Sequence, residues 1–226
     1  MDIEAFSELF PLFSTANPET IEWLLSVTTE HDYPAERTVL MEDSWGNAVY
    51  FIESGWVKVR RLTEDGETVT LAIMGKGDFF GEMSVLDESP RSTDVVALSP
   101  VKLFSVSAQR FIQLLFKDPQ LHHKMLQLMV RRLRNANARF SWRKQPPALK
   151  LVKTLLLLAE NYGQPTEQGL EIIQLSVSDL ADVADISTKE VEMILSKLEG
   201  KGWIEMGEGR IHLINFKQLT NLANRA

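Results

Sequence analysis

A series of short apolar runs between residues 30 and 106 constrains the fold of this chain more than any other feature of its sequence. Turn signals interrupt the runs about every 8–12 residues, a spacing typical of an all-β roll or barrel. Two of these signals, at residues 53–55 and 64–67, predict tight hairpins, and the second contains the turn-forming pair Asp65-Gly66. Alternate side chains from Ala48 to Ile52 are expected to face opposite sides of one strand. The sequence therefore predicts an antiparallel β-roll over this region.

Helices are predicted on both sides of the roll. Residues 3–29 have the pattern of two short helices, and Asn17 is a candidate N-cap for the second. A short helix is expected at residues 108–116, and Asp118-Pro119 then opens a long helix that runs to about Lys144. Proline suits the first helical position because its missing N–H would have no partner there.

The long helix carries an apolar seam with the period of a two-stranded coiled coil. Its members are spaced 4, 3, 4, 3 and 4 residues apart: His122, Leu126, Met129, Leu133, Ala136 and Phe140. This is the pattern of a helix that packs against a second copy of itself. The alternative is a stripe that packs on the protein's own roll. We favour a homodimer, because the helix is too long for a small roll to cover.

A glycine-rich segment at residues 75–93 has the chemistry of a pocket for a small anion. Glycines let the backbone approach a ligand closely, and successive backbone N–H groups can bind an anion. Gly81 and Glu82 open a short helical turn, and a helix N-terminus adds positive potential. Arg91 supplies a planar set of donors that matches a phosphate, and Glu82 can accept a hydrogen bond from a sugar hydroxyl.

Residues 80–93 resemble the phosphate-binding cassette of cyclic nucleotide-binding domains, F-G-E-x-[AGS]-L-L-x-x-x-P-R-[AST]-[AT], almost position by position. The resemblance implies that Glu82 binds the ribose 2′-hydroxyl, and that Arg91 and Ser92 bind the cyclic phosphate. The other cassette residues that it places at the nucleotide are Gly81, Met83, Ser84 and Thr93. The alternative is a roll that has kept its turn glycines after losing the ligand.

The C-terminal third has the element order of a winged helix-turn-helix. After the Gln-Pro-Pro hinge at residues 145–147, a helix is expected at 148–162, with Gly163 as its stop. A weak strand at 170–175 precedes two short helices that turn at about residues 185–186. Ser187 and Glu190 form a capping box at the start of the second helix, and residues 200–213 predict a two-stranded wing. In this motif the second helix enters a DNA major groove.

The complete order of elements resembles the cyclic-AMP receptor/FNR superfamily of bacterial transcription regulators. The resemblance implies an α+β fold: a cyclic nucleotide-binding, jelly-roll-like β-roll at 1–117, a dimerisation helix at 118–145 and a winged helix-turn-helix at 146–226. It places the homodimer interface on the long helix, at Leu126, Met129, Leu133, Ala136 and Phe140. The implied partners are double-stranded DNA and a small nucleotide effector, with RNA polymerase as a further candidate.

In this family the long helix also covers the base of the nucleotide, at positions that match Arg132, Ala136 and Asn137. Cyclic-AMP sensors of the family often carry a Thr-Ser pair at the last two positions. The Ala136 side chain cannot form a hydrogen bond, whereas the Asn137 amide can both donate and accept. Ser92 provides a hydroxyl that in some relatives also serves cyclic GMP. Cyclic AMP is therefore the default effector, and cyclic GMP is the alternative.

The second helix of the helix-turn-helix departs from the family pattern S-R-E-T-V-x-R. Thr188 and Met193 stand in place of two arginines, and Lys189 stands in place of the glutamate. Residues 176–202 carry six acids and three bases, a net charge of −3. Fewer phosphates can then be neutralised, which lowers affinity for DNA. The candidate DNA contacts that remain are Ser187, Thr188, Lys189 and Glu192.

Two classes of function are compatible with these departures. The first is a nucleotide-responsive regulator that binds DNA as a homodimer. The second is a sensor whose winged helix binds a protein partner, or which is not gated by a cyclic nucleotide. DNA retardation at physiological salt would favour the first class.

Composition argues against several other functions. With no cysteine, the chain can form no disulfide, thiolate zinc site or cysteine-ligated iron–sulfur cluster, and no metal is expected. The sequence has no H-E-x-x-H, G-x-S-x-G or P-loop motif, so an enzyme is not expected. The acidic N-terminus is unlike a signal peptide, and no apolar run reaches the roughly 18 residues of a membrane span. These features predict a cytoplasmic protein without a membrane partner.

The net charge is −7, but bases gather around the predicted hinge. No acid lies between residues 131 and 159, where eight cations occur: Arg131, Arg132, Arg134, Arg139, Arg143, Lys144, Lys150 and Lys153. Such a run is most often a solvated face. Here the ligand phosphate, the second domain and flanking DNA are three alternative partners, which the sequence leaves open.

Overall fold

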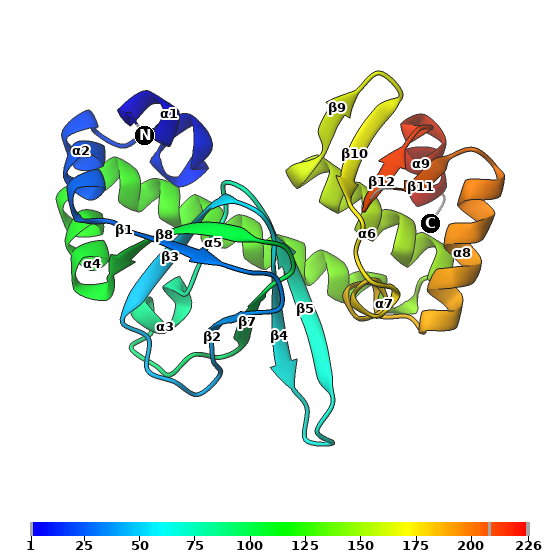
Figure 1. Ribbon diagram of the computed structural model, residues 1–226, viewed down its shortest axis with the longest axis horizontal. Coiled ribbons are helices and arrows are strands. Elements are labelled where there is room, and N and C mark those ends of the chain that lie inside the picture. Colours follow the sequence, from blue (N-terminus) through cyan, green and yellow to red (C-terminus); the bar gives the residue numbers. More distant parts are fainter. Residues whose placement is uncertain (1, 208, 225–226) are drawn as a thin grey trace. The chain divides into compact units, whose positions relative to one another are not determined.

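The computed structural model describes residues 2–207 and 209–224. Residue contacts divide the chain into two compact units, Met1–Ala136 and Asn137–Ala226, and each is described by itself below. Figure 1 labels most of the helices and strands of both units.

The N-terminal unit is built around two four-stranded antiparallel sheets, which form the predicted β-roll (Figure 1). Its strands are β1 (Thr29–Tyr33), β2 (Thr38–Leu40), β3 (Ala48–Ser54), β4 (Val57–Leu62), β5 (Thr68–Met74), β6 (Phe79–Phe80), β7 (Asp94–Ala97) and β8 (Val101–Ser107). One sheet has the strand order β1-β8-β3-β6 and the other the order β2-β7-β4-β5. The hairpin predicted at residues 64–67 is confirmed, because β4 and β5 pair on either side of it and Gly66 adopts a φ of 81°. The hairpin predicted at residues 53–55 is wrong: Gly55, with a φ of 85°, turns the chain there, but it leads from β3 in one sheet to β4 in the other, and these two strands do not pair.

Strand β3 separates two apolar cores, because its side chains alternate between its two faces. Val49 and Phe51 are fully buried in the larger core, where the Phe51 ring lies 5.6 Å from that of Phe10. Ile52 is fully buried in the second core, with Val57. The alternation predicted for this strand is confirmed, and β3 also pairs with β6, the strand that leads into the cassette.

Helices cover one end of the roll (Figure 1). They are α1 (Ile3–Leu9), the 3₁₀ turn η1 (Pro11–Phe13), α2 (Pro18–Val27) and α4 (Ala108–Lys117). Asn17 occupies the N-cap position of α2 as predicted, but its side chain makes no capping hydrogen bond. Its main-chain N–H instead donates to Asp118 Oδ2 at 2.8 Å. The fully buried Asp118 also accepts from the N–H groups of Gln120 and Leu121, so one carboxylate joins two helix starts.

The long helix α5 (Pro119–Ser141) begins at the predicted proline and ends in a 3₁₀ turn, η2 (Trp142–Lys144). Within the N-terminal unit its buried side chains are Leu121 and Met125, and Met129 is half-buried against the larger core. The other apolar seam residues are exposed: 55% for Leu126, 61% for Leu133 and 71% for Phe140. The seam therefore does not pack on the roll along its whole length.

The C-terminal unit combines helices with a four-stranded antiparallel sheet of order β11-β12-β10-β9. After the last residues of α5 and η2, its elements are α6 (Pro147–Tyr162), β9 (Gln164–Thr166), β10 (Gly169–Ile173), α7 (Val177–Ala184), α8 (Thr188–Gly200), β11 (Ile204–Gly207), β12 (Arg210–Leu213) and α9 (Phe216–Ala223). The predicted helix-turn-helix is α7 and α8, and the predicted wing is β11 and β12. Glu208, which the sequence placed in the wing, lies outside the described residues.

Two elements of this unit were not predicted. Strand β9 contains Pro165, and all three of its residues are exposed, so it has no apolar pattern to reveal it. Helix α9 is short, and it is held by the buried Leu219 and by an Asn215 side chain that caps its first turn. With these additions the predicted α+β fold, with a roll, a long helix and a C-terminal winged helix-turn-helix, is confirmed.

Candidate functional site

The glycine-rich cassette connects β6 to the one-turn helix α3 (Glu82–Leu86). Gly81 caps this helix with a left-handed backbone, φ 85°, which glycine adopts without steric cost. A Cβ atom at Gly81 would lie 2.7 Å from Arg91 Nη1 and 3.1 Å from Ala48 O. Only glycine therefore allows the backbone and the arginine to approach so closely.

Arg91 lies inside the cassette and is only 4% exposed. Its Nη1 donates to Gly81 O and to Ser84 Oγ, the latter at 2.6 Å, and its Nη2 donates to Ala48 O at 2.7 Å. A Cβ atom at Gly46 would lie 2.5 Å from Arg91 Cζ, so this glycine also leaves room for the guanidinium. Burial lowers the pKa of Arg91, but a guanidinium stays charged in a protein. The site is therefore a cation that backbone carbonyls hold in place.

Glu82 is 3% exposed and pairs with Arg132 of helix α5. Arg132 Nη1 donates to Glu82 Oε1 at 2.7 Å, and its Nη2 donates to Phe79 O at 2.7 Å. The Arg132 guanidinium also stacks over the Phe79 ring, with Cζ 4.3 Å from the centroid. Burial raises the pKa of Glu82, and Arg132 partly offsets that rise. The structure thus brings together two of the predicted nucleotide residues, one from the cassette and one from the long helix.

The remaining predicted nucleotide residues differ in exposure. Ser84 is buried and bonded to Arg91, and Thr93 is half-buried. The others have exposed side chains: Met83, Ser92, Ala136 and Asn137. Gly46 and the carbonyl of Ala48 were not predicted as parts of the site. A carbonyl leaves no signal in a sequence, and Gly46 has no distinctive motif around it.

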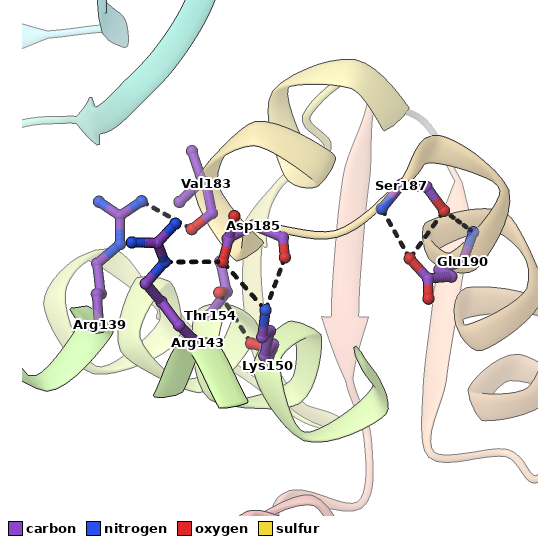
Figure 2. Close-up of polar contacts among 8 residues, drawn as sticks. All are labelled: Arg139, Arg143, Lys150, Thr154, Val183, Asp185, Ser187 and Glu190. Atoms are coloured by element: carbon purple, nitrogen blue, oxygen red, sulfur yellow. Dashed lines mark hydrogen bonds and ion pairs between the residues drawn. The ribbon is translucent and has the colours of Figure 1, made fainter. Parts of the chain in front are cut away.

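The helix-turn-helix presents all four predicted DNA contacts at its surface. Ser187, Thr188, Lys189 and Glu192 are exposed. They lie at the start of α8, whose opposite face is buried through Val191, Ile194, Leu195 and Leu198. The predicted capping box is confirmed: Ser187 Oγ accepts from the N–H of Glu190, and the Glu190 carboxylate accepts from the N–H of Ser187 at 2.8 Å (Figure 2).

The basic run that follows residue 131 is shared between different partners. Arg132 binds Glu82 in the N-terminal unit. In the C-terminal unit, Arg139, Arg143 and Lys150 reach the end of α7 and the turn after it (Figure 2). Lys153 donates to Gln145 Oε1 and faces the Trp142 ring. Three cations are exposed and form no ion pair with a residue that the structure describes: Arg131, Arg134 and Lys144.

Within residues 2–207 and 209–224, no group of three or more His, Asp or Glu side chains is arranged to hold a metal ion. In the same part of the chain, no helix has both the length and the apolar character needed to cross a bilayer.

Comparisons with known proteins agree with both halves of this arrangement. Residues 30–118 match the family of cyclic nucleotide-binding domains, and residues 149–222 match the Crp-like helix-turn-helix domain. The cyclic AMP receptor protein of Thermus thermophilus is 30% identical over 214 residues, which cover 94% of this chain and 96% of that protein. The CRP-like cAMP-activated global transcriptional regulator of Mycobacterium tuberculosis is also 30% identical, over 95% of this chain and 96% of its own length.

Solved structures show the same fold. The catabolite activator protein of Thermus thermophilus is 29% identical, with a TM-score of 0.53 over 94% of this chain and 98% of its own. FixK2 of Bradyrhizobium japonicum is 22% identical, with a TM-score of 0.77 over 88% of this chain and 99% of its own. The relatives from Thermus thermophilus and Mycobacterium tuberculosis are transcription regulators rather than enzymes. The chain belongs to the cyclic-AMP receptor/FNR superfamily, as a transcription regulator with a cyclic nucleotide-binding domain and a DNA-binding helix-turn-helix.

Proposed function

We propose that this regulator is a homodimer that responds to cyclic AMP and binds DNA through α8. The observation that carries the proposal is the buried Arg91 in a cassette whose carboxylate, Glu82, faces Arg132. The pocket would hold the cyclic phosphate at Arg91 and Ser92, and Glu82 would accept a hydrogen bond from the ribose. Gly81, Met83, Ser84 and Thr93 would complete the cassette. As a DNA-binding regulator the protein would act in the cytoplasm, with RNA polymerase as a candidate partner.

Cyclic AMP is the default effector because relatives that match almost the whole chain are named for it. The base would lie against α5 near Arg132, Ala136 and Asn137. Ala136 offers no hydrogen bond, so any polar selection between bases would fall to Asn137. Because an amide can donate and accept, cyclic GMP is the competing effector.

A homodimer would cover the exposed part of the α5 seam, Leu126, Leu133 and Phe140. Burying apolar area contributes about 25 cal/mol per Å², so these side chains favour association. Met129 and Ala136 would lie beside them in the interface. The effector would then favour one packing of the paired helices, as a shift between existing populations. In such a dimer the two DNA half-sites would lie about 34 Å apart, one helical turn.

Calorimetric titration of the full-length protein with cyclic AMP and with cyclic GMP tests the effector. We expect micromolar binding of cyclic AMP and weaker binding of cyclic GMP. Stronger binding of cyclic GMP would reverse the assignment of the base. No heat with either nucleotide, confirmed by equilibrium dialysis, would contradict a cyclic-nucleotide effector.

A second candidate function follows from the acidic character of the helix-turn-helix at residues 176–202, which we call the reading head. Residues 176–202 carry a net charge of −3, and α8 contains no arginine. Such a surface fits a basic protein partner better than a nucleic acid. Retardation of DNA by the wild-type protein at physiological salt would favour the regulator. Loss of retardation there, with retention of nucleotide binding, would favour the protein-binding sensor.

A further inference from the structure

Three cations meet at one point of the helix-turn-helix (Figure 2). Arg139 Nη2 donates to Val183 O, in the last turn of α7, at 2.7 Å. Lys150 Nζ, from α6, donates to Asp185 O at 2.8 Å and to Asp185 Oδ2 at 3.1 Å. Arg143 Nε lies 3.8 Å from the same carboxylate oxygen. The end of α7 and the turn that follows it are therefore bound from the segment that precedes the helix-turn-helix in sequence.

Asp185 stands at a demanding backbone position. Its φ and ψ are 55° and 53°, a left-handed conformation that non-glycine residues avoid but that Asp tolerates better than most. Its N–H donates to carbonyls of α7, so the residue ends that helix. This conformation is held by the hydrogen bonds of the Asp185 N–H to α7 and by those of Lys150 to the Asp185 carbonyl and carboxylate.

Lys150 is more buried than Arg143, the other cation that contacts the Asp185 carboxylate. Its side chain is only 10% exposed, whereas that of Arg143 is 64% exposed. A buried ammonium group without acceptors is costly, and both acceptors that bind Lys150 Nζ belong to Asp185. Loss of the Asp185 carboxylate would therefore disturb Lys150 as well as the turn.

Helix α8, the second helix of the helix-turn-helix, begins three residues after Asp185. Ser187 is the N-cap of α8, and the predicted DNA contacts Thr188 and Lys189 follow directly. Because Asp185 and Ser187 are separated by one residue, Ile186, movement of the turn must move the helix start. The contacts at Asp185 and the placement of the reading residues are thus linked through the backbone.

We propose that Asp185 is a positioning residue for DNA binding, whose carboxylate and main-chain carbonyl are clamped by Lys150 and Arg143 so that α8 begins at a fixed place. The inference rests on the DNA-binding function proposed above. The proposal predicts the direction in which DNA affinity changes when Asp185 loses its charge. Removing one acid from a DNA-facing surface raises affinity if charge alone matters, whereas removing the clamp lowers affinity.

The first test is hydrogen exchange in the full-length protein without DNA, followed in peptides that cover residues 184–192. Lys150→Met and Asp185→Asn should speed exchange of the first-turn amides roughly tenfold, because each breaks the charged contact. Lys150→Arg, which keeps a cation within reach, should retain slow exchange. Lys144→Met is the matched control, since Lys144 is an exposed neighbour that forms no ion pair with a described residue. Wild-type exchange rates in Lys150→Met and Asp185→Asn would overturn the clamp.

The second test uses a DNA duplex that the wild-type protein selects from a random-sequence library, with and without cyclic AMP. At constant salt we expect Lys150→Met and Asp185→Asn to bind this duplex about tenfold more weakly, which corresponds to about 1.4 kcal/mol. Lys150→Arg should restore most of the affinity. Tighter binding by Asp185→Asn, or equal losses for Lys150→Met and Lys144→Met, would overturn the positioning role. Failure of the wild-type protein to select any duplex would contradict the DNA-binding function, while hydrogen exchange would still decide the clamp.

Discussion

The cassette and the reading head use positive charge in opposite ways. In the cassette, Arg91 is buried, and main-chain carbonyls and Ser84 hold its guanidinium. In the reading head, α8 has no arginine, and its exposed first turns present Thr188, Lys189 and Glu192. The cassette depends on glycines, which its left-handed and closely packed backbone requires, and on the buried charges of Glu82 and Arg91. The reading head depends on surface side chains that can change while the fold stays the same.

The distribution of charge sharpens this contrast. Residues 1–136 contain 13 basic and 20 acidic residues, so they carry the whole net charge of −7. Residues 137–226 contain 11 of each and are neutral. Several cations of this second unit are already used internally, among them Arg139 and Lys150. We therefore expect DNA affinity to be modest, and to fall less steeply with added salt than it would for a domain with more free cations.

Replacing Arg91 tests the role of the buried cation in the cassette, and it has the largest expected effect. Arg91→Ala should lower the affinity for the cyclic nucleotide at least about 100-fold, because each hydrogen bond to a charged group contributes about 1.5–3 kcal/mol. Calorimetric titration measures the loss, and size-exclusion chromatography should show an unchanged oligomeric state. Arg37→Ala, which removes an exposed arginine of the roll, should bind like the wild type. Wild-type affinity in Arg91→Ala would remove this arginine from the proposed pocket.

The glycine-rich cassette could be recognised from the sequence because its residues have few alternatives. A left-handed Gly81, a buried Glu82 and a buried Arg91 each require one residue type at one place. The pairing of Glu82 with Arg132 was not predicted. The family resemblance placed Arg132 at the base, whereas the structure places its guanidinium on Glu82 and Phe79 O.

Other features could not be predicted, because they depend on main-chain atoms or on weak patterns. The carbonyls of Ala48 and Val183, which bind Arg91 and Arg139, have no sequence signature. Strand β9 was missed because it is short and exposed. The basic run was recognised, but its division between Glu82 and Asp185 follows only from the folded chain.

Replacing Asp118 tests how much its hydrogen bonds to the starts of α2 and α5 stabilise the N-terminal unit, which contains the cassette. In Asp118→Asn the amide nitrogen cannot accept, so the main-chain N–H groups bound to the replaced oxygen lose their acceptor: that of Asn17 at Oδ2, or those of Gln120 and Leu121 at Oδ1. An unsatisfied buried donor costs about 1–3 kcal/mol, and we expect the free energy of unfolding to fall by about 2 kcal/mol. Denaturant unfolding of the full-length protein gives this value. A loss below that range at neutral pH would mean that these hydrogen bonds contribute little.

The same variant has a defined pH dependence. Burial opposes ionisation of Asp118, but its hydrogen bonds outweigh that effect and hold its pKa below the ordinary value. A depressed pKa stabilises the folded state above the pKa of the unfolded chain, about 3.9, and this contribution is lost as the pH falls through the folded-state pKa. The difference between wild type and Asp118→Asn should therefore be constant near neutrality and narrow in acid. A difference that widens in acid would contradict the sign.

Introducing an arginine at the start of α8 tests whether the lack of arginine there limits DNA affinity. Thr188→Arg places a guanidinium at the first exposed position of α8, and a good contact to a base edge contributes about 1–3 kcal/mol. We expect binding to the selected duplex to tighten about tenfold, as measured by fluorescence anisotropy. Ser196→Arg adds the same charge to an exposed position further along α8. Equal gains in the two variants would mean that added charge, and not its place on the reading helix, changes the affinity.

The capping box offers the smallest and most local test. Ser187 Oγ accepts from the N–H of Glu190, and Ser187 donates to the Glu190 carboxylate, whose pKa these bonds lower. Loss of a serine N-cap costs about 1 kcal/mol, so Ser187→Ala should destabilise the C-terminal unit by that amount in thermal unfolding. Ser196→Ala, in the middle of α8, should be neutral or slightly stabilising because alanine favours helices. Both variants should bind cyclic nucleotide with wild-type affinity. Weaker nucleotide binding in Ser187→Ala alone would show that the start of α8 and the cassette are energetically coupled, and the two sites could then no longer be treated as independent.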